Sequence, residues 1–218
     1  MANASNPSSA PNAFSRKDQY AAKRRTLLLE AGRVFGQRGF GNSSLDEIAQ
    51  NLNITKTALY YYFKSKHEML FECYAASFDL ADEALNDALA EGSTAFDKVR
   101  RFIRNYTLAG LNDLNPTMPM REVDVLTPKH RAVIESRRSA LQRRLRELIQ
   151  AGIAEGSIAQ CEPRVLVIAI IGAVSWLLRA FNPKGELSAE TVTEQIVEIL
   201  TKGIDSRVVP PSARAGRK

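Results

Sequence analysis

Two short helices separated by a tight turn are the feature that most constrains the fold of this chain. Ser44, followed three residues later by Glu47, forms a capping box that starts the first helix. Residues 51–53 (Asn-Leu-Asn) end it, because asparagine tolerates the left-handed turn conformation, and Thr55 caps the second helix. Each helix carries few apolar anchors. A short helix, a tight turn and another short helix form the helix-turn-helix arrangement, which predicts binding to DNA.

The excess positive charge lies in the same part of the chain. The net charge is +6; residues 1–66 contain ten Lys or Arg against four Asp or Glu, whereas residues 67–218 contain twenty of each. A solvated basic face needs no such segregation, but a surface that neutralises phosphates does, because each Lys or Arg placed there releases condensed counterions. Charge alone also fits RNA or an anionic membrane surface. The helix-turn-helix pattern favours double-stranded DNA.

The rest of the chain has apolar residues at helical spacing and no internal repeat, so we predict an all-α fold. Helices are expected over about 21–38, 45–51, 56–63 and 65–89 and around 96–106. A long helix marked by apolar residues from Ile134 to Ile153 ends at Gly156, and two more follow, over 163–181 and after Ser188. Residues 112–128 contain three prolines and two methionines, which favours a loop with at most one short helix.

Four segments follow from this pattern. We expect a disordered tail over 1–15, a helix-turn-helix DNA-binding domain over 16–66, a helical ligand-binding and dimerisation domain over 67–207, and a tail over 208–218. The first segment is polar and has no apolar stretch, so we expect neither a secretory signal nor a membrane anchor.

Several classes of protein are disfavoured by the composition. The longest apolar run, 165–178, is shorter than the roughly 20 residues of a membrane span, which predicts a buried helix and no membrane partner. Cys73 and Cys161 have no companion at metal-ligand spacing, which is typical of reduced thiols in a cytoplasmic protein. The two histidines, His67 and His130, belong to no nucleophile motif, and there is no glycine-rich phosphate loop. We therefore expect no enzyme, no metal and no cofactor.

The helix-turn-helix region resembles the head of the tetracycline-repressor (TetR) family. The resemblance rests on the stretches SLDEIA (44–49), LNITKTALYYYFKSK (52–66) and EML (68–70), and extends back through AGRVFGQRGF (31–40). It covers about residues 22–72. Asn53 departs from the pattern, since the family most often has glycine there. The resemblance implies an N-terminal three-helix head on a C-terminal helical ligand-binding and dimerisation domain.

The resemblance also implies a set of DNA contacts, each with a physical reason. Residues at helix N-termini favour a phosphate, because unpaired amides and the helix dipole point there, and lysine at the start of the fourth helix holds another. The leading edge of the recognition helix reads base edges in the major groove, while its tyrosines reach the backbone or a thymine methyl. The candidate DNA-binding residues are Ser44, Thr55, Lys56, Thr57, Tyr60, Tyr61, Lys64 and Lys66.

The basic residues before the head have two interpretations. They are an arm for the minor groove or a solvated basic tail. The residues concerned are Arg16, Lys17, Lys23, Arg24 and Arg25.

The resemblance implies that the body dimerises through its last two helices. The alternative is that both helices belong to the core of the monomer. A ligand pocket is also implied, with wall candidates that could equally be plain core: Phe102, Tyr106, Met118, Met120, Trp176 and Arg179. Segments within 152–188 are similar to regulators that sense acyl-coenzyme A thioesters. Arginines on the long helix could hold coenzyme phosphates or form a solvated face: Arg137, Arg138, Arg143, Arg144 and Arg146.

The sequence therefore predicts a homodimeric, ligand-responsive transcriptional repressor. It binds a palindromic operator and is released by a small apolar effector. The resemblance of residues 152–188 suggests acyl-coenzyme A thioesters as that effector. The alternative is an architectural or constitutive DNA-binding protein without an effector.

Overall fold

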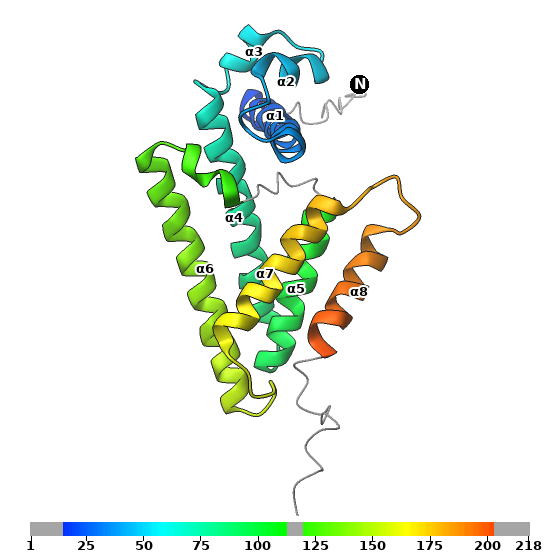
Figure 1. Cartoon of the computed structure of the whole chain (residues 1–218). Helices are drawn as coiled ribbons and strands as arrows, with labels where there is room; N and C mark the ends of the chain where they lie inside the picture. The colour runs from blue at the N-terminus through cyan, green and yellow to red at the C-terminus, as the bar shows by residue number, and fades with distance from the viewer. Residues whose placement is uncertain (1–14, 113–119, 203–218) are drawn as a thin grey trace, which may run out of the picture.

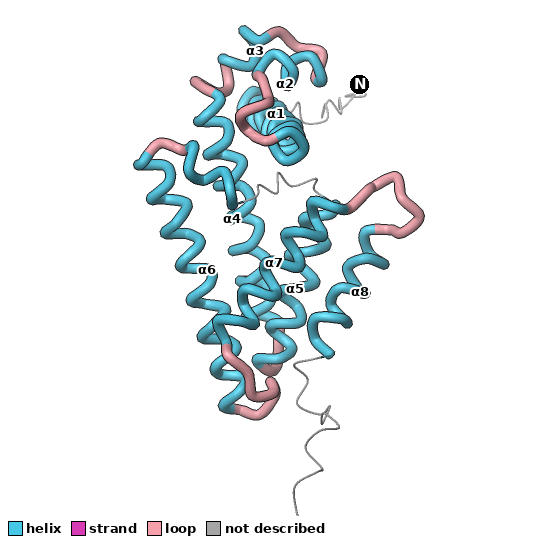
Figure 2. The backbone as a smooth tube through the Cα atoms, in the orientation of Figure 1, coloured by secondary structure: helices cyan, strands magenta, loops and turns pink. Residues whose placement is uncertain are grey.

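The computed structural model describes residues 15–112 and 120–202, and its regular elements are all helical there (Figures 1 and 2). The elements are α1 (Arg16–Arg38), α2 (Leu45–Asn51), α3 (Lys56–Tyr60), α4 (Lys66–Glu91), α5 (Ala95–Asn112), the 3-10 helix η1 (Met120–Val125), α6 (Pro128–Ala154), α7 (Pro163–Ala180) and α8 (Ala189–Lys202). Helices α1 to α3 form a head at one end of the molecule, and α4 to α8 form the body. The predicted all-α class is confirmed.

The short helices of the head begin where the sequence predicts. The side-chain oxygens of Ser44 and Thr55 each accept a hydrogen bond from the backbone N–H three residues later, at 3.0 and 3.1 Å, and Ser65 caps the longer α4 in the same way at 3.1 Å. Asn53 adopts φ of 52°, the left-handed conformation that the turn between α2 and α3 requires. Local hydrogen bonding therefore places both helices.

The first helix begins earlier than predicted, at Arg16 instead of about Ala21. Ser15 and Asp18 form a reciprocal capping box, in which the Ser15 side chain accepts the Asp18 N–H at 3.2 Å and the Asp18 carboxylate accepts the Ser15 N–H at 3.1 Å. The basic residues of this segment are therefore helical. Residues 16–25 are therefore part of α1 and form neither a separate arm nor a tail. Their contact with DNA stays a prediction.

Two hydrophobic clusters share helix α4. Its first half, including Met69, Leu70 and Tyr74, is buried in a cluster with α1, α2 and α3, to which η1 and the start of α6 also contribute. Its second half, from Ala81, is buried in a cluster with α5, α6, α7 and α8. Phe78 packs against both clusters. The continuous helix α4 enters both cores, and α6 also contributes to both through Ile134 and Leu141, so these two helices join head and body.

Helix α7 is covered on only one side. Only three of its residues are buried against the rest of the described chain, namely Val167, Ile170 and Val174. Val165, Ile168 and Trp176 are 63%, 66% and 68% exposed. By length and composition α7 could cross a membrane, but in this fold it packs on α5 and α6. The prediction of a buried helix is wrong for the single chain, because α7 is apolar on more sides than one body can cover.

The body predicts a sensitive position at Gly152 in α6. A Cβ atom there would lie 2.5 Å from Ile158 Cδ1 and 3.0 Å from Ala95 Cβ, both in the core. We expect Gly152→Ala to lower the free energy of unfolding by about 1–3 kcal/mol through overpacking. The exposed neighbour Gln150→Ala is the control and should change it by less than about 0.5 kcal/mol. Urea unfolding measures both, and an unchanged Gly152→Ala would show that Ile158 can move aside.

Candidate DNA-binding surface and effector cavity

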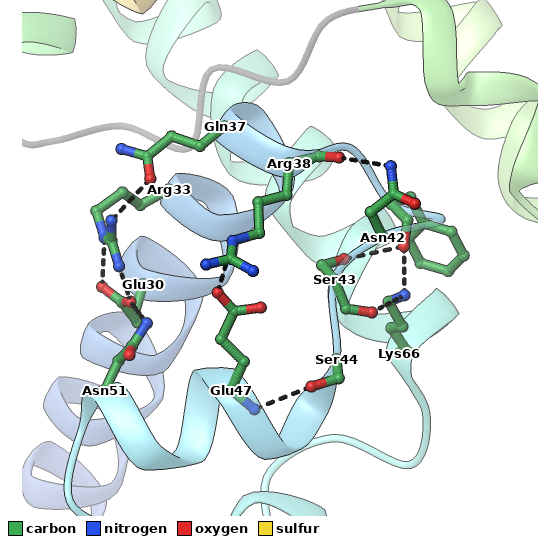
Figure 3. Close-up of polar contacts among 11 residues, drawn as sticks. Glu30, Arg33, Gln37, Arg38, Asn42, Ser43, Ser44, Glu47, Asn51 and Lys66 are labelled. Atoms are coloured by element: carbon green, nitrogen blue, oxygen red, sulfur yellow. Dashed lines mark hydrogen bonds and ion pairs between the residues drawn. The ribbon is translucent and has the colours of Figure 1, made fainter.

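Polar contacts brace α1 against α2 in the head (Figure 3). Glu30 accepts a hydrogen bond from Asn51 at 2.6 Å and pairs with Arg33 at 2.6 Å, while Arg38 pairs with Glu47 at 2.9 Å. Burial raises the pKa of Glu30, but the hydrogen bonds from Arg33 and Asn51 outweigh burial and hold this pKa below its ordinary value. The Glu30–Asn51 and Arg38–Glu47 contacts cross from α1 to α2 and hold the two helices together.

Lys66 closes the loop between α1 and α2. Its ammonium group donates hydrogen bonds to the carbonyl oxygens of Phe40 and Ser43, the latter at 2.5 Å (Figure 3). The same group lies 4.1 Å from the centroid of the Phe40 ring. The sequence assigned Lys66 to a DNA phosphate, whereas the structure directs its charge to the backbone of the head. Lys66 stabilises this loop because backbone carbonyls that face one another need a donor between them.

The other candidate DNA-binding residues lie exposed on one part of the head: Ser44, Thr55, Lys56, Thr57, Tyr60, Tyr61 and Lys64. Tyr61 is the most open of the tyrosines there, at 72% exposure. The hydroxyls of Ser44 and Thr55 accept backbone N–H groups, which leaves each hydroxyl proton to donate to a phosphate. Lys56 pairs with Asp46 at 2.7 Å, and this hydrogen bond raises the pKa of Lys56. The ion pair orients Lys56 at the first turn of α3.

Tyr20 of α1 is a member of this surface that the sequence analysis missed. Its ring stacks on Tyr62 with centroids 4.8 Å apart and meets Tyr61 edge-on at 5.8 Å. The signal was present, because Tyr20 precedes the buried Leu27 by two helical turns and so shares its face. A helix predicted to start at about Ala21 does not include Tyr20.

A cavity of about 280 Å³ lies in the body between α4, α5, α6 and α7. Its wall is mainly apolar and is formed by Tyr74, Ser77, Phe78, Ala81, Tyr106, Arg138, Leu141, Gln142, Ile171, Gly172, Ser175, Trp176 and Arg179. Burial raises the pKa of Tyr106, which is hydrogen-bonded to Ser175, so its phenol stays neutral at physiological pH. Arg179 lies over the Trp176 ring, 5.7 Å from its centroid. An apolar chamber with cations in its wall can hold an apolar ligand that carries a negative group.

The structure brings together three of the predicted ligand residues, Tyr106, Trp176 and Arg179. Phe102 is fully buried behind the wall, stacked on Tyr106 with centroids 5.7 Å apart. Met118 and the side chain of Met120 lie outside the described residues. The sequence analysis missed the contribution of α4, because its cavity-facing residues look like ordinary core residues of an amphipathic helix.

A second cavity, of about 600 Å³, lies between the head and the body. Thr26 and Arg33 of α1 face it from the head, and Leu111 of α5 faces it from the body. One arginine, Arg179 of α7, therefore borders both cavities.

A helix-turn-helix head carried by a helical body that holds a cavity defines a DNA-binding transcription regulator. The chain belongs to the TetR family. Residues 92–204 match the family model described as tetracyclin repressor-like, C-terminal domain, and residues 27–73 match the model of the bacterial regulatory proteins, tetR family. The resemblance seen in the sequence is confirmed.

Known relatives match most of the chain. The HTH-type transcriptional repressor KstR2 of Mycolicibacterium smegmatis is 26% identical over 85% of this chain and 92% of its own. The structure of the ketosteroid transcriptional regulator KstR2 of Mycobacterium tuberculosis is similar with a TM-score of 0.74, at 22% identity over 84% of this chain and 95% of that chain. AibR in complex with isovaleryl coenzyme A and operator DNA has a TM-score of 0.68, at 25% identity over 82% and 98%.

Lys64 and Lys66, on either side of the α4 N-cap, allow a direct test of the Lys66 assignment. We expect Lys66→Met to lower the free energy of unfolding by about 1–3 kcal/mol, because two backbone carbonyls lose a charged donor. Lys64→Met, on an exposed side chain, should change stability by less than about 0.5 kcal/mol. Thermal unfolding measures both. A Lys66→Met protein of unchanged stability that binds DNA less tightly would restore the phosphate role implied by the sequence.

Proposed function

We propose that this protein is a cytoplasmic transcriptional repressor that binds a near-palindromic operator as a homodimer and leaves it when a small apolar effector enters the body. The observation that carries the proposal is the position of the 280 Å³ cavity. Its wall includes α4, which is part of the head core, and α7, whose other side is uncovered. A ligand there touches the helix that carries the head and the helix available for a second subunit.

Dimerisation is supported by the apolar surface of α7 and α8. Val165, Ile168 and Trp176 on α7 are more than half exposed, and Ile199 on α8 is 68% exposed. Gly172 lies among them with open space around its Cα, so a second helix can approach closely. A small head reads few base pairs by itself, and two heads on a symmetric dimer read two half-sites. The uncovered face and the need for two heads point to the same assembly.

On the operator, the exposed residues of α3 take the roles implied by the family. Lys56 and Thr57 lie at the N-terminal end of the recognition helix and face base edges in the major groove. Ser44 and Thr55 donate to phosphates from helix N-termini, and Tyr60 reaches the backbone. Phosphate contacts orient the head, and the base contacts select the sequence.

An acyl-coenzyme A thioester is the effector that fits this cavity best. The apolar chamber suits an acyl chain, which gains about 0.8 kcal/mol for each buried CH₂ group. A volume of about 280 Å³ is too small for the whole coenzyme, so the coenzyme extends outward past Arg138 and Arg179, which attract its phosphates. The similar protein AibR was solved with isovaleryl coenzyme A and operator DNA, which supports the same ligand class here.

Release follows from a shift between two arrangements of the heads. A ligand that binds better when α4 is displaced selects the arrangement in which the heads no longer match adjacent major grooves. A coupling of about 1–3 kcal/mol changes operator affinity by roughly 5- to 150-fold. An effector-independent DNA-binding protein has no use for such a chamber, so the cavity favours the ligand-responsive function.

A charged substitution on the exposed face of α7 tests the dimer. We expect Ile168→Glu to sediment as a monomer at micromolar concentration, because a carboxylate must then be buried in an apolar interface. Its affinity should fall for a duplex selected by the wild-type protein from a random library, which we expect to carry two half-sites about one helical turn apart or somewhat more. Val133→Glu on α6 is the control, since Val133 is exposed but lies off this face. A wild-type protein that stays monomeric with and without the duplex would refute the dimer.

Titration of the operator complex with acyl-coenzyme A thioesters and free fatty acids tests the effector. We expect at least one thioester to release the DNA, and Trp176→Leu to bind DNA normally but to lose this release, because Trp176 lines the cavity. Phe102→Leu, in the core behind the wall, should lower stability and leave the response unchanged. If no compound releases DNA up to about a millimolar, an affinity near −4 kcal/mol, the thioester assignment is wrong.

A further inference from the structure

The first two turns of α1 lie outside the helix-turn-helix motif, yet the structure fixes them against it. The capping box of Ser15 and Asp18 starts the helix at Arg16. Tyr20, one turn further on, stacks on Tyr62 and meets Tyr61 edge-on, at 4.8 and 5.8 Å between ring centroids. The N-terminal turns of α1 therefore hold a defined position beside the C-terminal end of α3.

The face of α1 that carries Tyr20 is basic. Residues one helical turn before and after Tyr20 share its side of the helix. They are Arg16, Lys17, Lys23 and Arg24. Since Tyr20 contacts the tyrosines that follow the recognition helix, the same face presents these cations at the edge of the exposed DNA-binding residues.

Among the described residues, one cation on this face is paired with a carboxylate and three are not. Arg24 pairs with Glu72 at 3.2 Å and lies over the Phe63 ring at 4.9 Å. Arg16, Lys17 and Lys23 are exposed, and none of them has a carboxylate within ion-pair distance in the described part of the chain. Much of the surplus charge of the head is therefore uncompensated at the start of α1.

We propose that the N-terminal turns of α1 form a second DNA-contacting element, in which Arg16, Lys17 and Lys23 bind phosphates beside each half-site and Tyr20 positions them by stacking on Tyr62. This inference rests on the proposed DNA-binding function and adds to it a contact surface outside the helix-turn-helix. The bound group is the phosphate backbone of double-stranded DNA. The backbone that carries these three cations is already ordered in a capped helix, so binding orders only their side chains, whereas a tail would also lose backbone freedom.

The charge test compares R16Q/K17Q/K23Q with the wild-type protein. The probes are a duplex selected by the wild-type protein from a random library and a scrambled duplex of the same length. For B-DNA each phosphate contact contributes about 0.9 units to the slope of log affinity against log salt, so the slope should flatten by up to about 2.7 units for each head. The loss should appear on both duplexes, because phosphates carry no sequence information.

A matched triple variant controls for net charge. R100Q/R143Q/K184Q removes three exposed cations from the body and should keep the wild-type slope. If the body variant flattens the slope as much as the α1 variant, or the α1 variant keeps the wild-type slope, the proposal is overturned. A wild-type protein that binds no duplex would overturn the proposed function as well, so the two failures are distinguishable.

Tyr20 is tested by two substitutions. Tyr20→Phe keeps the stacked ring and should retain the wild-type salt slope. Tyr20→Ala removes it and should flatten the slope in the same direction as the charge variant, while circular dichroism shows the helical content retained. If Tyr20 only supported the fold of the head, Tyr20→Ala would lower the fraction of active protein and leave the slope unchanged, which would overturn the positioning role.

Discussion

The arrangement of this molecule depends on the burial of one helix, α4, in two hydrophobic cores. Its first half packs with the three helices of the head, together with η1 and the start of α6, and its second half packs with α5 to α8. Burying apolar area on both halves makes it costly for α4 to bend or detach, since core positions such as Leu70 and Leu85 would lose their contacts. A displacement of the body end of α4 must therefore move the head, which is the physical basis for a link between cavity and DNA.

Polar interactions hold the helices of the head in place over shorter distances. Side-chain caps fix where α2, α3 and α4 begin, and the Glu30–Asn51 and Arg38–Glu47 contacts tie α1 to α2. Lys66 adds a charge-assisted bond to the loop between them. Exposed ion pairs each contribute little stability, so the hydrophobic core dominates the energy. The polar contacts set the geometry in which the DNA-facing residues stand.

The cavity of the body and the exposed side of α7 share residues. Trp176 and Gly172 line the cavity and lie on the uncovered face. A helix with apolar residues on most sides buries one side within the chain and leaves the other exposed for contact with a second surface. In the proposed assembly, ligand and partner subunit contact the same helix, so that filling the cavity changes the surface offered to the partner.

The sequence by itself determined what depends on neighbours along the chain. The caps at Ser44, Thr55 and Ser65, the left-handed Asn53 and the all-α class were all predictable, because these are local hydrogen-bonding and periodicity effects. Only the tertiary structure decided which side chains meet across helices. It directed Lys66 to two carbonyls, buried Phe102 behind the cavity wall, brought α4 into that wall and joined Tyr20 to Tyr62. Such contacts depend on helix rotation and distance in space, and no periodicity in a single segment encodes them.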